Sequence, residues 1–404
     1  MNWILKRTKG DAVIWGVVIL LSVFGLLAVY SSTGTLAYQK QGGNTEFYLF
    51  KHLSFLLFGL ALLYLSHQVN FKYYSRISQI LLVLSFILLP YTLFFGTEIN
   101  QGVRWITLPI IGFTFQTSDL AKLALIMYVA RFLSKKQDEI KDFKKAFLPI
   151  VLTVSGICGL IAPANLSTAL VLFSTCLLLM FIGRIAFKHI LLVVGAGAGA
   201  AALLITLAVT LPDDTVKKIA RLSTWKSRIE RFIESDNEGN TRRAALETDY
   251  QVVQSKIAIA SGGIFGKGPG NSTQRNFVPN PFSDSVYAII LEEYGIVGGA
   301  FLVLLYLVLL FRCIRIVIKS PRAFGALLAV GLSFSLVIQA FINMGVAVNI
   351  FPVTGLPLPL VSMGGTSLMF TSLAFGIILS ISRDIEEKEK SGLETEEGGQ
   401  LATP

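Results

Sequence analysis

Long apolar segments recur along the whole chain, and they limit its possible folds more than any other feature. Only 15% of the 404 residues are charged, whereas a soluble protein carries roughly 25%. A run of about 20 apolar residues spans the hydrocarbon core of a bilayer, where a helix satisfies its own backbone polar groups. We therefore predict an all-α polytopic membrane protein. The ten expected membrane helices cover residues 12–31, 49–67, 77–95, 118–134, 147–163, 166–183, 188–211, 285–311, 323–346 and 361–382.

The placement of lysine and arginine predicts the orientation of these helices. With the N-terminus in the cytoplasm, most basic residues on the short connections fall on the cytoplasmic side, as the positive-inside rule requires. Both termini are then cytoplasmic, and the large loop 211–284, between helices seven and eight, is extracytoplasmic. The first apolar run is too long for a signal peptide, so we retain it as a helix. Residues 1–385 are expected to form one transmembrane unit, and 386–404 a disordered cytoplasmic tail.

The three cysteines and three histidines do not indicate a metal or haem site. The cysteines fall in or beside apolar runs, where a small buried hydrophobe is the ordinary role. The histidines, His52 among them, are scattered at membrane edges without the spacing of metal ligands. We expect no organic cofactor. The net charge of +10 is mostly explained by cytoplasmic anchoring, so it does not argue for nucleic acid as a partner.

Asp284 closes the large outer loop, where the chain returns to apolar sequence. Pro279 and Pro281 precede it, and Ser285 begins the next apolar run. A carboxylate held there by two prolines can meet both water and a lipid headgroup. If the protein is an enzyme, we expect its chemistry at this residue.

Two other parts of the large loop can be interpreted in two ways. Residues 215–233 alternate apolar and basic side chains at helical spacing, which predicts a basic amphipathic helix on the outer membrane surface. That helix either anchors the loop or collects an anionic lipid headgroup. The glycine-rich segment 262–270 is either an anion-binding backbone nest or a plain flexible turn.

Polar residues near the predicted membrane helices suggest further functional positions. Lys122 begins a span and can pair with Asp119, one helical turn earlier, or contact a ligand. Arg104, beside a tryptophan, is either an interfacial anchor or a ligand contact. Glu292 and Glu293 lie deeper than Asp284 and do not form a carboxylate pair with it, so a structural role is at least as well supported.

The last outer connection, residues 349–367, is apolar and contains three prolines. We predict a rigid hairpin that re-enters the membrane. Irregular backbone at that depth is tolerated only where it is buried in protein or lines a watery cavity. The segment therefore predicts a cavity.

Five blocks of sequence follow one another in a fixed order. They are Arg104-Trp105-Ile106, Gln116 to Lys122, Gly266 to Ser272, Pro279 to Asp284 followed by Glu292-Glu293-Tyr294-Gly295, and Pro352 to Pro359 followed by Ser362 to Ser367. Together they resemble the signature motifs of the SEDS family of bacterial shape, elongation, division and sporulation proteins. The sequence departs from the usual family pattern at Thr117, Asp119 and Asn165, where that family has Pro, Glu and Asp.

The resemblance implies a peptidoglycan glycosyltransferase that polymerises lipid II, the undecaprenyl-pyrophosphate-linked disaccharide-peptide, outside the bacterial cytoplasmic membrane. It also implies a class B penicillin-binding protein transpeptidase, other division proteins and membrane lipids as partners. The segments Lys9 to Trp15 and Tyr30 to Thr33 look more like the division type, at the septum, than the elongation type. The residues implied to contact substrate are Arg104, Gln116, Lys122, Asn271, Ser272, Pro279, Ser362, Gly364 and Gly365.

In this reaction Asp284 is expected to be the catalytic residue. The acceptor hydroxyl must lose a proton, which a carboxylate can accept as general base. The departing pyrophosphate carries concentrated negative charge, which Arg104, Lys122 or a divalent cation (Mg or Mn) held by Asp284 can stabilise. Two alternatives remain. A lipid II flippase needs polar groups along a path through the membrane midplane, and a membrane scaffold does not need Asp284 at all.

Overall fold

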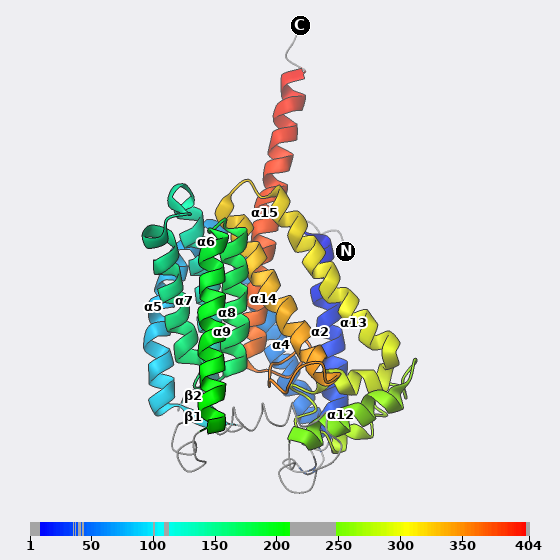
Figure 1. The fold of residues 1–404 in the computed structure, drawn as a ribbon. Coiled ribbons are helices and arrows are strands. Elements are labelled where there is room, and N and C mark those ends of the chain that lie inside the picture. Colours follow the sequence, from blue (N-terminus) through cyan, green and yellow to red (C-terminus); the bar gives the residue numbers. More distant parts are fainter. Residues whose placement is uncertain are drawn as a thin grey trace.

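The computed structural model describes residues 9–34, 36, 38, 42, 44–99, 102–108, 113–210 and 248–400. Within these ranges, long helices run side by side in a bundle, and each predicted apolar segment falls on one of them (Figure 1). The helices are α2 (Ala12–Ser32), α4 (Thr45–Gln68), α5 (Phe71–Phe95), α6 (Thr117–Lys135), α7 (Leu148–Ile161), α8 (Leu166–Ile182), α9 (Phe187–Thr210), α13 (Val286–Lys319), α14 (Ala323–Ala347) and α15 (Thr366–Gln400).

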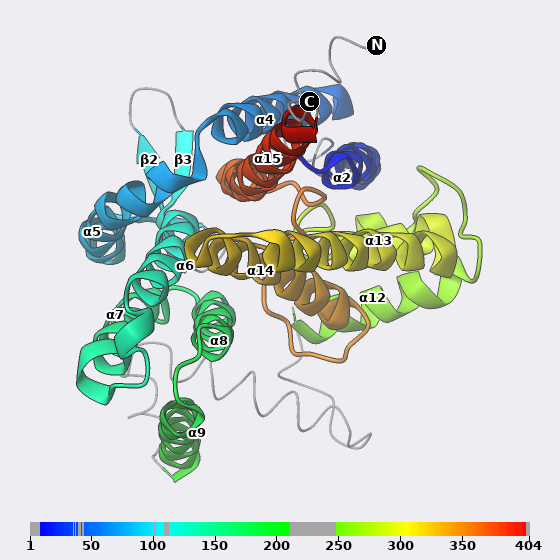
Figure 2. The ribbon, with the colours of Figure 1, turned by 90° about the horizontal axis from the view of Figure 1, so that it is seen from above.

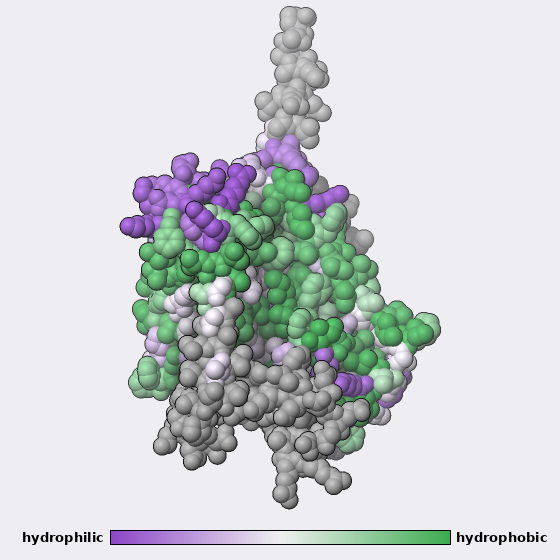
Figure 3. Space-filling view, viewed as in Figure 1, coloured by the Kyte–Doolittle hydropathy of each residue, from purple (hydrophilic) through white to green (hydrophobic). Residues whose placement is uncertain are grey.

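The apolar character of these helices confirms the predicted fold class. In the described part of the chain, seven helical segments are long and apolar enough to cross a membrane. The helices α6, α8 and α9 are not in that set, so the number of ten crossings stays a prediction. Figure 3 shows an apolar surface around the middle of the bundle and hydrophilic residues at the end where α15 projects.

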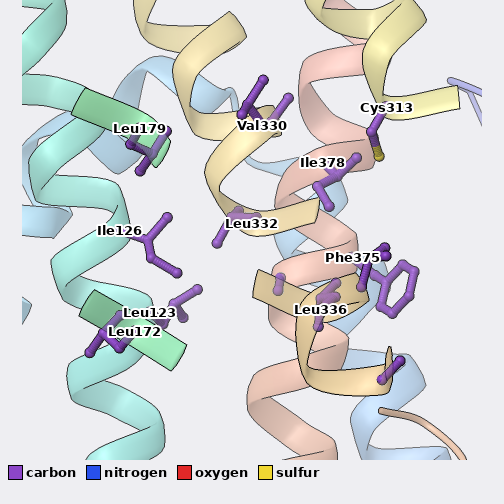
Figure 4. Packing of buried hydrophobic residues seen from close by; sticks show 14 of the residues in the cluster. Leu123, Ile126, Leu172, Leu179, Cys313, Val330, Leu332, Leu336, Phe375 and Ile378 are labelled. Atoms are coloured by element: carbon purple, nitrogen blue, oxygen red, sulfur yellow. The ribbon is translucent and has the colours of Figure 1, made fainter. Parts of the chain in front are cut away.

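The centre of the bundle is formed by α6, α14 and α15. Seen along the bundle, α2, α4 and α15 lie on one side of α14, and α7, α8 and α9 lie on the other (Figure 2). Leucine and isoleucine side chains of α6 and α8 face those of α14, and Phe375 and Ile378 of α15 extend the same core (Figure 4). This burial stabilises the bundle through close packing rather than through exclusion of water, because lipid tails are as apolar as the side chains.

Polar contacts tie α2 to the rest of the bundle at the end where the chain begins. Asp11 caps α2 by accepting hydrogen bonds from the N–H groups of Val13 and Ile14 at 2.9 and 3.2 Å. Its other carboxylate oxygen accepts from Arg312 Nε of α13 at 2.7 Å. Lys9 Nζ lies 3.0 Å from Glu387 of α15. The start of the described chain therefore meets the middle of α15, near Glu387, at one end of the bundle.

At the opposite end, the connection between α5 and α6 folds into a small antiparallel sheet. Its strands are β1 (Thr97–Ile99), β2 (Gly102–Leu108) and β3 (Phe113–Gln116), in the order β1-β2-β3. Trp105 pairs with Gln116. The sequence analysis did not anticipate these strands, because each is short and their pairing is not encoded by hydropathy. The sheet leads straight into α6 and so determines where α6 begins.

The large outer loop is described only from residue 248. It contains α12 (Thr248–Gly262) and a short 3-10 turn, Gln274–Asn276. The predicted amphipathic helix 215–233 lies outside the described residues. At the other end of the chain α15 continues as a helix to Gln400, whereas a disordered tail was expected from residue 386. Ion pairs at i,i+4 spacing, Asp384 with Lys388 at 2.6 Å and Glu386 with Lys390 at 2.7 Å, support this extension.

The second part of the connection between α14 and α15, residues 356–362, is mostly buried among the helices, whereas Ile350 and Phe351 near its start are exposed. Leu358 and Leu360 are each 1% exposed. Tyr306 of α13 donates a hydrogen bond to Pro359 O at 2.6 Å. A Cβ added to Gly25 of α2 would lie 2.6 Å from Leu360 O, so glycine at this position lets α2 approach the loop closely. We call residues 349–365 the re-entrant loop.

Candidate active site

A cavity of about 380 Å³ opens at the end of the bundle opposite the chain termini and is lined in part by the re-entrant loop. Its walls also come from α4, the small sheet, α6, α8, α14 and the segment 280–283. Of the residues predicted to contact substrate, Gln116, Lys122, Gly364 and Gly365 line this cavity. The predicted cavity is therefore confirmed, and four residues from distant parts of the sequence meet in it.

A chain of polar contacts crosses the floor of the cavity. Asp119 Oδ1 and Lys122 Nζ on α6 lie 3.7 Å apart, and their side chains are only 6% and 14% exposed. Lys122 also donates to Gln339 Oε1 of α14 at 2.9 Å. The amide nitrogen of Gln339 donates to Pro357 O of the re-entrant loop at 2.7 Å. The ion pair expected from the sequence is thus present, and it leaves Lys122 at the cavity wall.

Asp284 is positioned by the next polar residue on the same face of α14, Asn343. The amide nitrogen of Asn343, which is 1% exposed, donates to Asp284 O at 2.9 Å and to Leu356 O at 2.7 Å. One side chain thereby joins the turn that carries Asp284 to the re-entrant loop. Gly355 lines the cavity, and a Cβ added there would lie 4.0 Å from Asp284 Oδ2. Asp284 therefore lies at the edge of the cavity, although it is not one of its lining residues.

Ser362 and Met363 make a second connection between the same two segments. Ser362 Oγ donates to Ser283 O at 2.5 Å and accepts from Leu358 N–H at 2.8 Å. The N–H of Met363 donates to Phe282 O at 2.8 Å. The structure thus places Ser362, predicted to contact substrate, where it supports the backbone beside Asp284.

Glu292 of α13 is fully buried and binds the loop that leads to Asp284. Its carboxylate pairs with Lys267 Nζ at 2.6 Å and accepts from Thr273 N–H and Gln274 N–H, both at 3.1 Å. It also accepts from Ser272 Oγ at 2.5 Å. A buried carboxylate is tolerated when it is paired and hydrogen-bonded in this way. The structural interpretation of Glu292 is the one that the contacts support.

Glu293 has a related role. It is 1% exposed, accepts from Ser31 Oγ of α2, and accepts from Ser272 N–H at 3.3 Å. The two neighbouring carboxylates therefore hold the same short segment, 267–274, against α13 and α2. That segment precedes Asp284 by about ten residues, so it anchors one end of the turn on which Asp284 lies.

A break in α13 explains the glycines of this region. Gly295 has φ 67° and interrupts the helix. The freed backbone groups pair with the glycine-rich segment: Lys267 N–H donates to Glu292 O at 3.0 Å, and Ile296 N–H donates to Gly263 O at 3.0 Å. A Cβ on Gly295 would lie 2.2 Å from Ile264 O. These glycines allow two backbone segments to pack closely, a purpose that neither the nest nor the flexible-turn interpretation included.

Asn271, Ser272 and Pro279 do not line the cavity. Ser272 is buried against Glu292, and Asn271 donates to Lys267 O at 3.1 Å. Pro279 O accepts from Ser285 Oγ at 3.5 Å. The backbone of Arg104 lies in β2, but its side chain is outside the described part of the structure. Their contacts with substrate stay predictions.

Sequence reasoning missed several residues of this site. Gln339 and Asn343 carry amides four residues apart in an otherwise apolar helix, and that spacing could have identified one polar face of α14. Lys51 and His52 of α4 also line the cavity. The sequence indicates only that His52 lies at a membrane edge, because nothing local shows that this edge faces the cavity instead of lipid.

The described residues contain no group of three or more histidine, cysteine, aspartate and glutamate side chains that could hold a metal ion. Asp119 is already paired with Lys122, which leaves Asp284 as the carboxylate at the cavity edge. Magnesium is often bound by one or two carboxylates together with phosphate oxygens of a substrate. The residues present fit a cation of that kind, shared with a phosphorylated ligand.

Taken together, the site has a carboxylate at the cavity edge, cationic side chains in a partly enclosed cavity, and a buried polar network beside them. A carboxylate can accept a proton from a hydroxyl nucleophile. Lysines in a cavity of low dielectric constant stabilise an anionic leaving group more strongly than in water. The arrangement suits the transfer of a group from a phosphate ester or pyrophosphate to a hydroxyl.

Comparison with known proteins points in the same direction. The family model of the cell cycle proteins FtsW, RodA and SpoVE matches residues 11–387. Stage V sporulation protein E of Bacillus subtilis (strain 168) is 31% identical over 382 residues, which are 94% of this chain and 98% of that protein. A Coxiella burnetii protein named "Probable peptidoglycan glycosyltransferase FtsW" is 33% identical over 383 residues, with 92% and 96% covered.

Solved structures share the fold. A chain described under "Structural coordination of polymerization and crosslinking by a peptidoglycan synthase complex" superposes with a TM-score of 0.69 at 26% identity, covering 93% of this chain and 98% of that one. The Rod shape determining protein RodA of Thermus thermophilus gives a TM-score of 0.64 at 24% identity, covering 93% and 97%. The second likeness shows the fold alone.

Proposed function

This chain belongs to the family of cell cycle proteins that includes FtsW, RodA and SpoVE, and we propose that it polymerises lipid II into glycan strands as a peptidoglycan glycosyltransferase of cell division. Relatives named as FtsW glycosyltransferases match it over nearly their whole length. The observation that carries the proposal is the cavity itself. It brings Lys122 of α6 and the re-entrant loop to the edge where Asp284 lies.

In the proposed reaction, the hydroxyl of one lipid-linked sugar attacks the anomeric carbon of another. A new carbon–oxygen bond forms, the bond from that carbon to the pyrophosphate breaks, and the hydroxyl proton passes to Asp284. Lys122 stabilises the charge of the departing lipid pyrophosphate. Asn343 and Ser362 hold the backbone beside Asp284, which keeps the carboxylate within reach of the hydroxyl.

We further propose that Asp284 would hold a divalent cation, Mg or Mn, when the pyrophosphate substrate is bound. When bound, such an ion would supply Lewis-acid stabilisation of the leaving group. The support is the presence of a carboxylate beside a cationic cavity and the preference of magnesium for carboxylate and phosphate oxygens.

The site is proposed to face the outside of the bacterial cytoplasmic membrane, with both termini in the cytoplasm, at the division septum. Support comes from the positive-inside pattern and from α13, which starts just after Asp284 at the end of the bundle away from the N-terminus (Figure 1). A class B penicillin-binding protein is the proposed partner, since a solved relative belongs to a complex that couples polymerization and crosslinking. Other division proteins and membrane lipids complete the proposed set.

The test is polymer formation from purified lipid II in detergent by the protein together with its penicillin-binding partner. Polymer is expected from the wild type and none from Asp284→Ala, with both proteins folded. Detergent abolishes flipping across a bilayer but not glycosyl transfer, so polymer excludes a pure flippase. Full activity of Asp284→Ala would refute the catalytic assignment. Replacement of a division-type or an elongation-type gene in cells decides between the two cellular roles.

A further inference from the structure

His52 is a buried polar side chain that the mechanism above does not use. It lies on α4, is 1% exposed, and lines the cavity. Its Nε2 has no hydrogen-bond partner among the described residues. A buried nitrogen of this kind is costly unless a ligand or water completes its hydrogen bonding.

The other two histidines each also have a buried ring nitrogen without a partner, Nδ1, but neither lines the cavity and both rings pack against aromatic neighbours. His67 Nε2 lies 2.7 Å from Lys9 O, and its ring packs edge-on against Trp15 with centroids 5.5 Å apart. The ring of His189 packs against Phe147 at 4.9 Å. For His52 the described structure contains neither a hydrogen bond nor a ring contact of this type. What distinguishes it is its position at the cavity.

The charges of the cavity indicate the ligand chemistry. Lys51 and Lys122 line it together with a single acidic residue, Asp119, so the wall carries an excess of positive charge. A sugar hydroxyl does not require that excess, whereas a phosphate does. A neutral imidazole can add one N–H donor to a phosphate oxygen.

The depth of His52 agrees with this ligand. It is seven residues beyond Thr45, where α4 begins, which places it about 10 Å along the helix from its outer end. In a lipid-linked saccharide the phosphates lie between the sugars and the lipid tail. A group that is deeper than the cavity edge therefore meets the phosphates before it meets the sugars.

We propose that His52 is a substrate-binding residue whose Nε2–H donates a hydrogen bond to a phosphate oxygen of a lipid-linked pyrophosphate. This inference rests on the proposed function for the identity of the substrate. It adds a contact from α4, a helix that the proposed mechanism does not otherwise use. His52 binds and orients the substrate, and Asp284 acts on the hydroxyl.

The test compares two replacements of the ring in the full-length protein with its partner. His52→Phe keeps a planar ring and removes both nitrogens, whereas His52→Gln keeps a side-chain N–H donor. The expected result is a KM for lipid II raised about tenfold or more in His52→Phe, with kcat within twofold, and a KM within threefold of wild type in His52→Gln. A purely structural histidine predicts the reverse order, and that order would overturn the proposal.

Binding measurements separate this proposal from the proposed activity. The probes are undecaprenyl pyrophosphate, which has the phosphates and lacks the sugars, and inorganic pyrophosphate, which lacks the lipid. His52→Phe should weaken undecaprenyl pyrophosphate binding by the same factor as lipid II binding. Weaker binding of lipid II alone would assign His52 to the sugars and refute the phosphate contact. Tight, His52-dependent binding of inorganic pyrophosphate alone would assign the site to a free anion and refute a lipid-linked ligand.

Two further results separate a failure of the proposed polymerase activity from a failure of the proposed His52 contact. A wild type that makes no polymer but binds undecaprenyl pyrophosphate in a His52-dependent manner refutes the activity and supports the binding site. If His52→Phe does not fold, the wild-type ring is followed by ¹⁵N NMR of labelled histidine during titration with undecaprenyl pyrophosphate. A shift of the His52 Nε2 resonance is expected, and an unchanged resonance at saturating ligand would overturn the proposal.

Discussion

Asn343 is the residue whose replacement most directly tests how the site is held together. Its amide nitrogen donates to Asp284 O and to Leu356 O, at 2.9 and 2.7 Å. Asn343→Leu has a similar size and removes both donors. The turn that carries Asp284 and the re-entrant loop then lose the side chain that joins them, while Asp284 itself is unchanged.

For Asn343→Leu we expect a small loss of unfolding free energy and a large fall in kcat. Side-chain hydrogen bonds inside membrane proteins contribute on average about 0.6 kcal/mol and at most about 1.7 kcal/mol each. Two lost bonds therefore amount to roughly 1–3 kcal/mol, which a bundle of this size tolerates. A displacement of a reacting group by about 1 Å can lower a rate about 100-fold. We expect kcat to fall about 10- to 100-fold, with KM for lipid II within about threefold.

The assay is polymer formation from lipid II by the purified protein with its partner, accompanied by thermal unfolding. Ser333→Ala is the matched control, because Ser333 is equally buried on α14 but does not line the cavity; it donates to Val330 O of its own helix at 3.0 Å and lies beside Cys313 of α13. Its kcat should stay within twofold of wild type. Asn343→Asp should be at least as damaging as Asn343→Leu, since carboxylate oxygens would then face two carbonyl oxygens. Wild-type kcat in both Asn343 variants would refute the reasoning.

Two further changes test other parts of the structure. Gly295→Ala places a methyl group 2.2 Å from Ile264 O at a backbone φ of 67°. We therefore expect a strong loss of folded protein, measured by size-exclusion recovery and thermal unfolding. The control is Gly159→Ala, where a Cβ meets nothing within 4 Å, and its recovery should be unchanged. Lys122→Met leaves the buried carboxylate of Asp119 unpaired, which costs about 3–5 kcal/mol, so we expect reduced stability and no polymer. The double variant Asp119→Asn with Lys122→Met should recover stability but not polymer formation.

Each of these predictions has a clear contradicting result. Normal recovery of Gly295→Ala would mean that α13 and the glycine-rich segment do not pack as closely as described. Polymer formation by the double variant at the wild-type rate would show that Lys122 serves only to neutralise Asp119. In that case the stabilisation of the leaving group must come from another cation.

The bundle was predictable because membrane insertion is governed by local composition. Each predicted apolar run corresponds to a helix, although α15 continues past its predicted end. The pair Asp119 and Lys122 was predictable for the same reason, since residues three apart share a helix face. The buried re-entrant loop followed from three prolines in apolar sequence. In all these cases the information lies within a few neighbouring residues.

The sequence was less informative where two backbone segments pack against each other. The glycines of segment 262–270 suggested an anion nest or a flexible turn, but Gly262 and Gly266 pack against the backbone of α13 beside the break at Gly295. The hairpin strands β1 to β3 were missed as well. Hydropathy does not report close backbone packing or strand pairing, because both depend on the partner segment as much as on the segment itself.

The sequence alone thus determined which segments form long apolar helices and which residue types are available for chemistry. Only the tertiary structure decided which of them meet. Asn343 and Asp284 are 59 residues apart in the chain, and His52 comes from a different helix from either. The physical reason is that the partition of a segment into the membrane depends on its own composition. A cavity, in contrast, exists only after helices distant in sequence have packed around it.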